Sequence, residues 1–260
     1  MIRTVNATRY VLPLREGGSL PAIVEADDLG LYVVKFRGAG QGPLALVAEL
    51  VAGEIGRVLG LRVPEIVFVD LDPALGRNEP DAEIRHLLKS SAGLNLALDY
   101  LPGSTMFDPA ARDTVTPSEA SLVVWFDAFL QNVDRTPRNA NLLMWHRKLY
   151  LIDHGAALYS HHNWDTMAQK AVARFEQIAQ HVLLPWAREI ENAVEVAKTK
   201  INEPAFAEIV SQVPDAWLEV IPSGQSAEEK RRAYVDFLTR RLAASKIFEE
   251  EAMNAHARLV

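Results

Sequence analysis

The sequence has no cysteine, no long apolar run and no excess of positive charge over its 260 residues. The lack of cysteine excludes disulfides, zinc–thiolate sites and thiol nucleophiles, and it is compatible with a reducing compartment. No apolar stretch approaches the roughly 18 to 20 residues that cross a bilayer, and the segment Met1 to Asn6 lacks the apolar core of a signal peptide. We therefore expect a soluble, cytoplasmic protein with no membrane partner.

The net charge is −7 and the isoelectric point is near 5.5. Nucleic-acid binding depends on a basic face, so this balance argues against a direct nucleic-acid partner. Basic residues cluster only on one expected helix near the C-terminus, where acidic residues are interleaved with them, and this pattern predicts a solvated helix face. The basic residues of this cluster are Lys230, Arg231, Arg232, Arg240 and Arg241.

Two aspartates and an asparagine follow apolar segments in the middle of the chain. Asp134 ends one apolar run, Asn139 comes five positions later, and the strand-like run 149–152 leads into Asp153. Protein kinases place a catalytic aspartate, a metal asparagine and a metal aspartate in this order, and carboxylate and amide oxygens suit Mg²⁺. The pattern predicts that Asp134 accepts the proton of the attacking hydroxyl group or orients that hydroxyl. It predicts Asn139 and Asp153 as metal ligands. The alternative interpretation makes Asp134 and Asn139 ordinary turn residues around Pro137.

Upstream of this triplet, Lys35 ends a strand-like run and has two acidic candidates as partners. A kinase needs a cation for the α and β phosphates and a glutamate from the following helix to hold that cation. Glu49 lies in the apolar stripe of the expected helix, where an unpaired carboxylate is costly, so we favour it over Glu54. The site is thus expected to contain Lys35, Glu49 and Asp134 as its catalytic groups. The alternative is a strand-end lysine that extends into water.

Two further segments are candidates for nucleotide contacts. Gly17, Gly18 and Ser19 lie between the first two expected strands, where glycine lets backbone N–H groups approach phosphate oxygens, although a plain hairpin turn fits equally well. The segment Asp99-Tyr100-Leu101 lies at the expected boundary between the two parts of the chain, and its backbone is expected to hydrogen-bond the adenine.

Histidines offer a competing metal hypothesis. His154, His161 and His162, with Asp153 and Asp165, could bind a transition metal, but their spacing matches no zinc pattern. Local hydrogen bonding is the favoured interpretation of these histidines.

The distribution of elements predicts an α+β, two-lobed protein-kinase-like fold. A small N-terminal β-sheet lobe (1–98) with one helix precedes a larger, mostly helical C-terminal lobe (99–260). Expected strands cover 8–14, 22–25, 30–36 and 65–70, the expected helix covers 44–59 between Pro43 and Gly60, and a hairpin pairs 142–145 with 149–152. Capping boxes predict helix starts at Thr116-Pro117-Ser118-Glu119 and at Ser226-Ala227-Glu228-Glu229.

Taken together, Lys35, Glu49, the segment Asn132 to Asn139, and Asp153 resemble the motifs of the HipA-like kinases. These bacterial relatives of serine/threonine kinase toxins share catalytic features with phosphatidylinositol 3- and 4-kinases. The resemblance covers roughly residues 30 to 160 by motif. It implies Mg·ATP binding, with Asp134 as catalytic aspartate, Asn139 and Asp153 as metal ligands and Lys35 as phosphate-binding lysine. The chain departs from the toxin kinases in placing an arginine after Asp134, and from ordinary kinases in placing a histidine after Asp153.

The leading functional hypothesis is an ATP- and Mg²⁺-dependent kinase that transfers the γ-phosphoryl group to a Ser/Thr hydroxyl of a protein substrate. A nucleotide-binding pseudokinase that acts as an interaction module, and a small-molecule phosphotransferase, are the alternatives. The sequence specifies neither the phosphate acceptor nor an oligomeric state.

Overall fold

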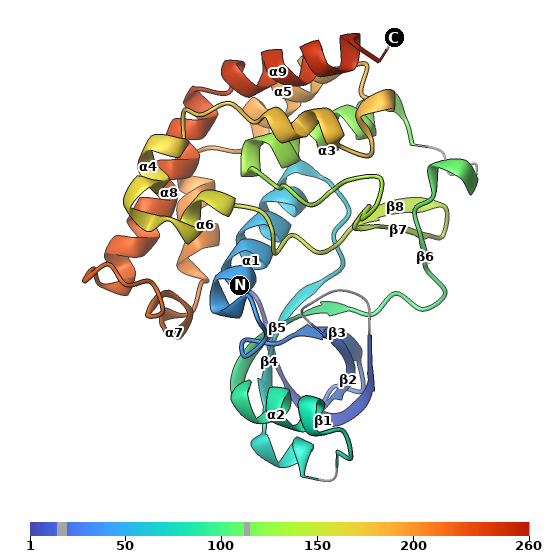
Figure 1. Cartoon of the computed structure of the whole chain (residues 1–260), viewed down its shortest axis with the longest axis vertical. Coiled ribbons are helices and arrows are strands. Elements are labelled where there is room, and N and C mark those ends of the chain that lie inside the picture. The colour runs from blue at the N-terminus through green and yellow to red at the C-terminus, as the bar shows by residue number, and fades with distance from the viewer. Residues whose placement is uncertain (15–19, 78, 112–114, 260) are drawn as a thin grey trace.

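The apolar residues of the first hundred positions fold into a closed barrel, where the sequence predicted a small β-sheet. The strand order is β1-β2-β3-β5-β4, and the barrel closes because β1 pairs antiparallel with β2 and parallel with β4. The strands of the barrel are β1 (Thr4–Pro13), β2 (Ala22–Ala26), β3 (Leu31–Lys35), β4 (Ile66–Leu71) and β5 (Gly93–Asp99). The computed structural model describes residues 1–14, 20–77, 79–111 and 115–259, and Figure 1 shows the barrel at the end of the molecule opposite the C-terminus.

The alternation of side chains along β4 explains why both of its faces are buried. Val67 and Val69 point into the barrel core, whereas Ile66 and Phe68 belong to the larger core shared with the helices. The same alternation holds in β5, a strand that the sequence analysis missed. The barrel is therefore joined to the rest of the protein through the outer face of β4 and β5.

A second helix also belongs to this lobe and corrects the expectation of one helix. In α2 (Ala82–Ser90), Asp81 caps the N-terminus by accepting hydrogen bonds from the backbone N–H groups of Glu83 and Ile84. Its apolar side chains Leu87 and Leu88 pack against the barrel core, and Figure 1 shows α2 against the barrel.

Helix α1 (Gly42–Leu59) begins two residues earlier than expected and connects the lobes. Pro43 lies in its first turn, and Gly60, with φ of 89°, ends the helix in the left-handed conformation that glycine adopts without strain. Most of its residues belong to the larger core. In Figure 1, α1 runs from the barrel into the helical lobe, so its N-terminal end lies near the barrel and its C-terminal end lies among the helices.

The C-terminal lobe is built around α3 (Pro117–Leu130), which is buried along most of its length. Thr116 caps it by accepting a hydrogen bond from the N–H of Glu119, and β6 (Thr105–Met106), β7 (Leu142–Trp145) and β8 (Lys148–Leu151) form a small sheet beside it. The other helices are α4 (Trp164–Lys170), α5 (Ile190–Lys200), α6 (Glu203–Ser211), α7 (Asp215–Leu218), α8 (Ala227–Ala243) and α9 (Lys246–Ala257). Short 3₁₀ turns are η1 (Pro73–Gly76), η2 (Pro109–Ala111), η3 (Tyr159–His162), η4 (Glu176–Gln180) and η5 (Leu184–Trp186).

The basic cluster on α8 differs from the expected solvated face. The helix starts at the predicted capping box, with Ser226 and Glu229 bonded to each other's backbone, but two of its cations are buried. Lys230 donates to the carbonyls of Leu218 and Ile221 at 3.0 Å each. Arg241, which is 0% exposed, donates to four backbone carbonyls. Backbone carbonyls at the ends of other elements are unsatisfied acceptors, and these cations satisfy them.

Among the described residues, no helix is both long and apolar enough to span a bilayer.

Packing between α7 and β4 gives a prediction about stability. Trp217 is fully buried, its ring lies edge-on to Phe68 at 5.7 Å between centroids, and its Nε1–H donates to the carbonyl of Leu94 at 3.3 Å. We expect Trp217→Ala to lower the free energy of unfolding by about 3–5 kcal/mol, because it leaves a cavity between the lobes. Urea unfolding measures this loss. Val220→Ala, at an exposed position nearby, should change stability by less than about 0.5 kcal/mol, and equal effects of the two substitutions would contradict the argument.

Candidate active site

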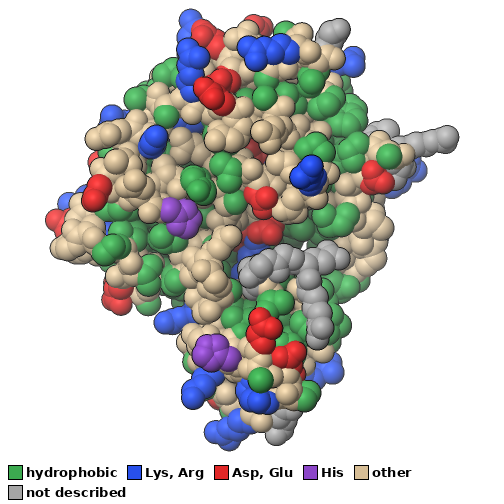
Figure 2. All heavy atoms as spheres, in the orientation of Figure 1, with side chains coloured by type: hydrophobic (Ala, Val, Ile, Leu, Met, Phe, Trp, Pro, Cys, Tyr) green, Lys and Arg blue, Asp and Glu red, His purple; other side chains and the backbone are tan. Residues whose placement is uncertain are grey.

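A cleft of about 620 Å³ lies between the two lobes. Acidic side chains gather in the hollow between the lobes in Figure 2, and the cleft lining brings together residues that are far apart in the sequence. Of the predicted site residues, the lining contains Lys35, Asp99, Tyr100, Leu101, Asp134, Asn139 and Asp153. Glu49 lies behind this lining, fully buried, whereas Gly17, Gly18 and Ser19 lie outside the described residues.

Lys35 bridges the two lobes with two ion pairs. Its Nζ lies 2.6 Å from Glu49 Oε2 on α1 and 2.6 Å from Asp153 Oδ1, just after β8. Burial acts to lower the pKa of Lys35, but the charges of Asp153 and Glu49 raise it overall. The ammonium therefore stays charged. Glu54, the other candidate partner, pairs instead with Arg57 on the helix surface.

His154 completes the surroundings of Glu49. Its Nδ1 lies 3.3 Å from Glu49 Oε1, and both side chains are fully buried. Burial acts to raise the pKa of Glu49, but the charge of Lys35 and the hydrogen bond with His154 hold it at about 2. His154 thus orients the glutamate, and among the described residues no three or more His, Cys, Asp and Glu side chains form a metal-binding group. His161 is also engaged locally, through Nδ1 and the hydroxyl of Tyr234 at 3.0 Å.

Asp134 lies on the loop between α3 and β7 and is held by asparagines. Asn139 and Asn141 donate through their Nδ2 groups to Asp134 Oδ2 at 2.8 and 3.3 Å. The loop doubles back on itself because Thr136 and Asn139 exchange two backbone hydrogen bonds. The carboxylate therefore has a fixed direction at the mouth of the cleft.

Asp153 has an unusual backbone conformation. Its φ is 54°, in the left-handed region that costs energy for residues with a side chain. Such conformations persist where the surrounding structure fixes them, and they occur often at functional sites. The turn directs its half-exposed carboxylate toward Lys35 and the cleft.

Behind Asp134 lies a buried polar cluster that the sequence analysis did not anticipate: Asp127, Asn132, Arg135 and His181. The carboxylate of Asp127, on α3, accepts hydrogen bonds from Arg135 Nε at 2.6 Å, His181 Nε2 at 2.8 Å and Asn132 Nδ2 at 2.9 Å. His181 Nδ1 accepts the N–H of Leu183, which places the ring proton on Nε2. Burial acts to raise the pKa of Asp127, but Arg135 and these hydrogen bonds lower it overall.

One signal in the sequence could have identified this cluster. Asp127 stands inside the apolar segment Trp125 to Leu130, where a carboxylate is costly without a partner. The cation that satisfies it, Arg135, directly follows the predicted catalytic aspartate. His181 has no comparable signal, because only the folded chain brings it to Asp127.

The segment from β5 into the C-terminal lobe forms the back of the cleft. Asp99 and Tyr100 use their backbone N–H groups within the protein, donating to the carbonyls of Glu65 and Leu31 at 2.8 and 2.9 Å. Burial and the nearby charge of Glu65 raise the pKa of the Asp99 carboxyl. Leu101 and Leu98 add apolar surface to this wall.

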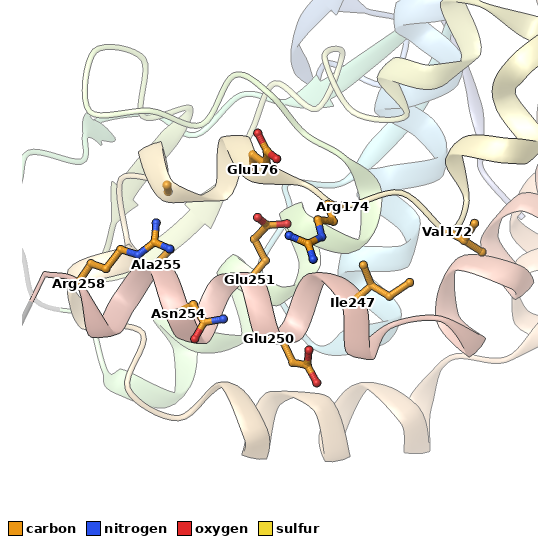
Figure 3. Close-up of a pocket in the computed structure, with 10 residues that line it drawn as sticks. Val172, Arg174, Glu176, Ile247, Glu250, Glu251, Asn254, Ala255 and Arg258 are labelled. Atoms are coloured by element: carbon orange, nitrogen blue, oxygen red, sulfur yellow. The ribbon is translucent and has the colours of Figure 1, made fainter.

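A second hollow, of about 660 Å³, lies on the C-terminal lobe between α9 and the segment leading through η4 (Figure 3). It contains none of the predicted site residues. Arg174 and Arg258 share it with Glu176, Glu250 and Glu251, and this mixture of charges does not converge on one ligand. The interlobe cleft is therefore the candidate active site.

Comparison with known proteins agrees with this geometry. The family model for HipA-like kinases matches residues 9–249. The chain belongs to the HipA-like kinase family. A HipA-like kinase is a phosphotransferase, and the cleft is where the predicted phosphotransfer residues meet.

Solved structures show a similar fold. The proinflammatory kinase CtkA of Helicobacter pylori is 14% identical with a TM-score of 0.55, and the similarity covers 99% of both chains. A Golgi casein kinase with Mn/ADP bound is 12% identical with a TM-score of 0.53, over 96% of this chain and 73% of the other. None of the curated proteins matches the chain significantly.

The pKa of Glu49 gives a prediction about pH. Because it is lowered from its ordinary value of 4.5 to about 2, the ionised carboxylate stabilises the fold above pH 4.5, and this stabilisation disappears as the pH falls through about 2. We expect Glu49→Gln to lower the free energy of unfolding by on the order of 3 kcal/mol near pH 6, with a difference from wild type that shrinks below pH 4.5. Urea unfolding across this range measures it, with Glu54→Gln, a partly exposed glutamate on the same helix, as the control. A difference that does not change with pH would contradict the assignment.

Proposed function

We propose that this HipA-like kinase transfers the γ-phosphoryl group of ATP to a Ser/Thr hydroxyl of a protein, with Mg²⁺ as the divalent cation. The observation that carries the proposal is the pair of contacts made by Lys35, to Glu49 and to Asp153, opposite Asp134 in one cleft. Phosphoryl transfer needs a cation that binds the phosphates, a carboxylate that binds the metal ion and a carboxylate beside the acceptor hydroxyl. Lys35, Asp153 and Asp134 are the proposed groups.

Nucleotide binding fits the shape and lining of the cleft. Its apolar walls, which include Val33, Leu98 and Ile152, suit a flat base, and Lys35 lies where the phosphates would follow. The Mn/ADP named for the Golgi casein kinase structure supports the same use here. The segment Asp99 to Leu101 is the proposed backbone contact for adenine, through groups other than the N–H groups of Asp99 and Tyr100, which bond to Glu65 and Leu31.

The donor set also fits a hard divalent cation. Asp153 supplies a carboxylate that is 47% exposed, and Asn139 uses its Nδ2 on Asp134, which leaves its amide oxygen for a metal. We propose Asp153 and Asn139 as the residues that would hold Mg²⁺. When bound, the cation neutralises charge that develops on the phosphates.

Asp134 is the proposed catalytic aspartate. The acceptor oxygen forms a bond to the γ-phosphorus while the bond from that phosphorus to the β–γ bridging oxygen breaks, and ADP leaves. The acceptor's proton passes to the carboxylate of Asp134, which Asn139 and Asn141 hold in place. Lys35 stays charged throughout and orients the phosphates, because Glu49 fixes its position.

Activity measurements test the proposed parts. We expect Asp134→Asn and Asp153→Asn each to lower kcat for Mg·ATP turnover by about 100-fold or more, because each removes a charge that acts in the transition state. ADP release and autophosphorylation with labelled ATP measure this. Asp165→Asn is a matched control outside the cleft lining. Wild-type activity in both site variants would exclude the proposed mechanism, and an inactive wild-type protein that binds ATP would favour the pseudokinase alternative.

Thermal unfolding tests the nucleotide site separately from turnover. ATP with Mg²⁺ at about 100 times the dissociation constant should stabilise the wild-type fold by about 2.7 kcal/mol, which raises the Tm by several degrees. We expect Lys35→Met to lose most of this shift, because it removes the phosphate-binding cation. An equal shift in Lys35→Met would show that ATP binds without using this lysine.

A further inference from the structure

Two cations, the partly buried Lys35 and the buried Arg135, approach the end of β8 from different parts of the protein. Lys35, from the barrel, bonds to the carboxylate of Asp153. Arg135, from the loop that carries Asp134, donates through Nη1 to the carbonyl of Asn141 and, over a longer 3.4 Å, to the carbonyl of Ile152, the residue before Asp153. Lys35 binds the phosphates in the proposed function, whereas that function gives Arg135 no role.

Arg135 is placed to connect the two proposed catalytic loops. It directly follows Asp134 in sequence, and its guanidinium reaches the carbonyl just before β7 and the carbonyl just after β8. Its own carbonyl accepts the N–H of Val182 at 3.1 Å, which fixes its backbone from a third side. A planar guanidinium with several donors can satisfy a carboxylate and two carbonyls together, and an ammonium cannot do so with the same geometry.

Asp127 fixes the guanidinium in turn. Its Oδ2 accepts from Arg135 Nε and from His181 Nε2, and its Oδ1 accepts from Asn132. Asn132 Oδ1 then accepts the backbone N–H of Asp134 at 3.2 Å. The carboxylate of Asp127 therefore anchors the residues on both sides of Asp134.

Burying the ion pair between Asp127 and Arg135 costs free energy, so stability is a weak reason for its presence. Asp127 and Arg135 are both fully buried, and a buried ion pair is often no more stabilising than apolar residues of similar volume. Arg135 Nη2 also has no hydrogen-bond partner in the described part of the chain. Stability alone does not explain the pair, whereas the need for a fixed separation between two catalytic loops does.

We infer that Arg135, held by Asp127, is a positioning residue that sets the separation between Asp134 and Asp153. The inference rests on the proposed function of those two aspartates. It assigns Arg135 no contact with substrate: the guanidinium acts only through the backbone carbonyls on either side of the β7–β8 hairpin.

The test compares Arg135→Lys with Arg241→Lys. Arg241 is an equally buried arginine that donates to four backbone carbonyls, and none of them belongs to the Asp134 loop or the β7–β8 hairpin. Both substitutions should lower the Tm by several degrees. Only Arg135→Lys should lower kcat for Mg·ATP turnover, by about 100-fold, because misplacing catalytic groups by about 1 Å has an effect of that size.

A binding measurement separates positioning from general damage. ADP affinity without metal depends on the proposed base and lysine contacts, so calorimetric titration should give the wild-type Kd for Arg135→Lys. The factor by which Mg²⁺ tightens ADP binding should fall, because Asp153 is displaced relative to Asn139. If Arg135→Lys does not fold, Asp127→Asn provides the same comparison, since it removes the charge that fixes the guanidinium and keeps the shape of the side chain.

The outcomes distinguish this inference from the proposed function. If Asp134→Asn is inactive but Arg135→Lys loses no more kcat than Arg241→Lys, the positioning role is wrong and the kinase mechanism stands. An unchanged Mg²⁺ effect on ADP affinity in Arg135→Lys would also overturn the role. If Asp134→Asn is as active as wild type, the proposed function itself fails.

Discussion

The contacts of Lys35 are the constraint on which the arrangement of the two lobes depends. The lysine ends strand β3 of the barrel, Glu49 comes from α1, and Asp153 follows the hairpin of the C-terminal lobe. A charged ammonium with 13% of its side chain exposed needs both carboxylates, because burial alone would favour its neutral form. Lys35 therefore links the barrel, the connecting helix α1 and the segment that follows β8.

Apolar packing holds the elements that carry Lys35, Glu49 and Asp153 in place. Helix α1 packs against the outer face of β4 and β5 and against the helices of the C-terminal lobe, and its side chains belong to the same core as α3. Trp217 adds a second contact between the lobes, far along the chain from α1. An ion pair holds its geometry when the elements that carry it cannot shift independently, and this shared core provides that condition.

Local signals in the sequence predicted local structure well. Pro43 lies in the first turn of α1 and Gly60 ends it, Ser226 and Glu229 form the capping box of α8, and the hairpin of β7 and β8 lies where the apolar runs predicted it. These features depend on residues within a few positions of each other, so a single sequence contains the information.

Features that depend on distant residues were missed or misjudged. Barrel closure requires β1 to pair in parallel with β4, about sixty residues away, and no local pattern indicates that pairing. The charges of α8 were expected in solvent, yet Lys230 and Arg241 bind carbonyls from other elements. The site residues could be proposed because kinases share their order along the chain, whereas Asp127 and His181 meet only in the folded protein.

Two buried carboxylates, Glu49 and Asp127, have parallel functions in this geometry. Each lies on a helix, is fully buried and holds one cation, and each cation then bonds to the end of β8: Lys35 to the side chain of Asp153 and Arg135 to the carbonyl of Ile152. A single buried pair could be replaced by apolar residues without loss of stability. Apolar side chains cannot, however, fix the direction of a neighbouring carboxylate or carbonyl, because dispersion contacts are not directional. The strained backbone at Asp153 is thus held from both lobes, and this double attachment explains why the chain keeps two charged pairs in its interior.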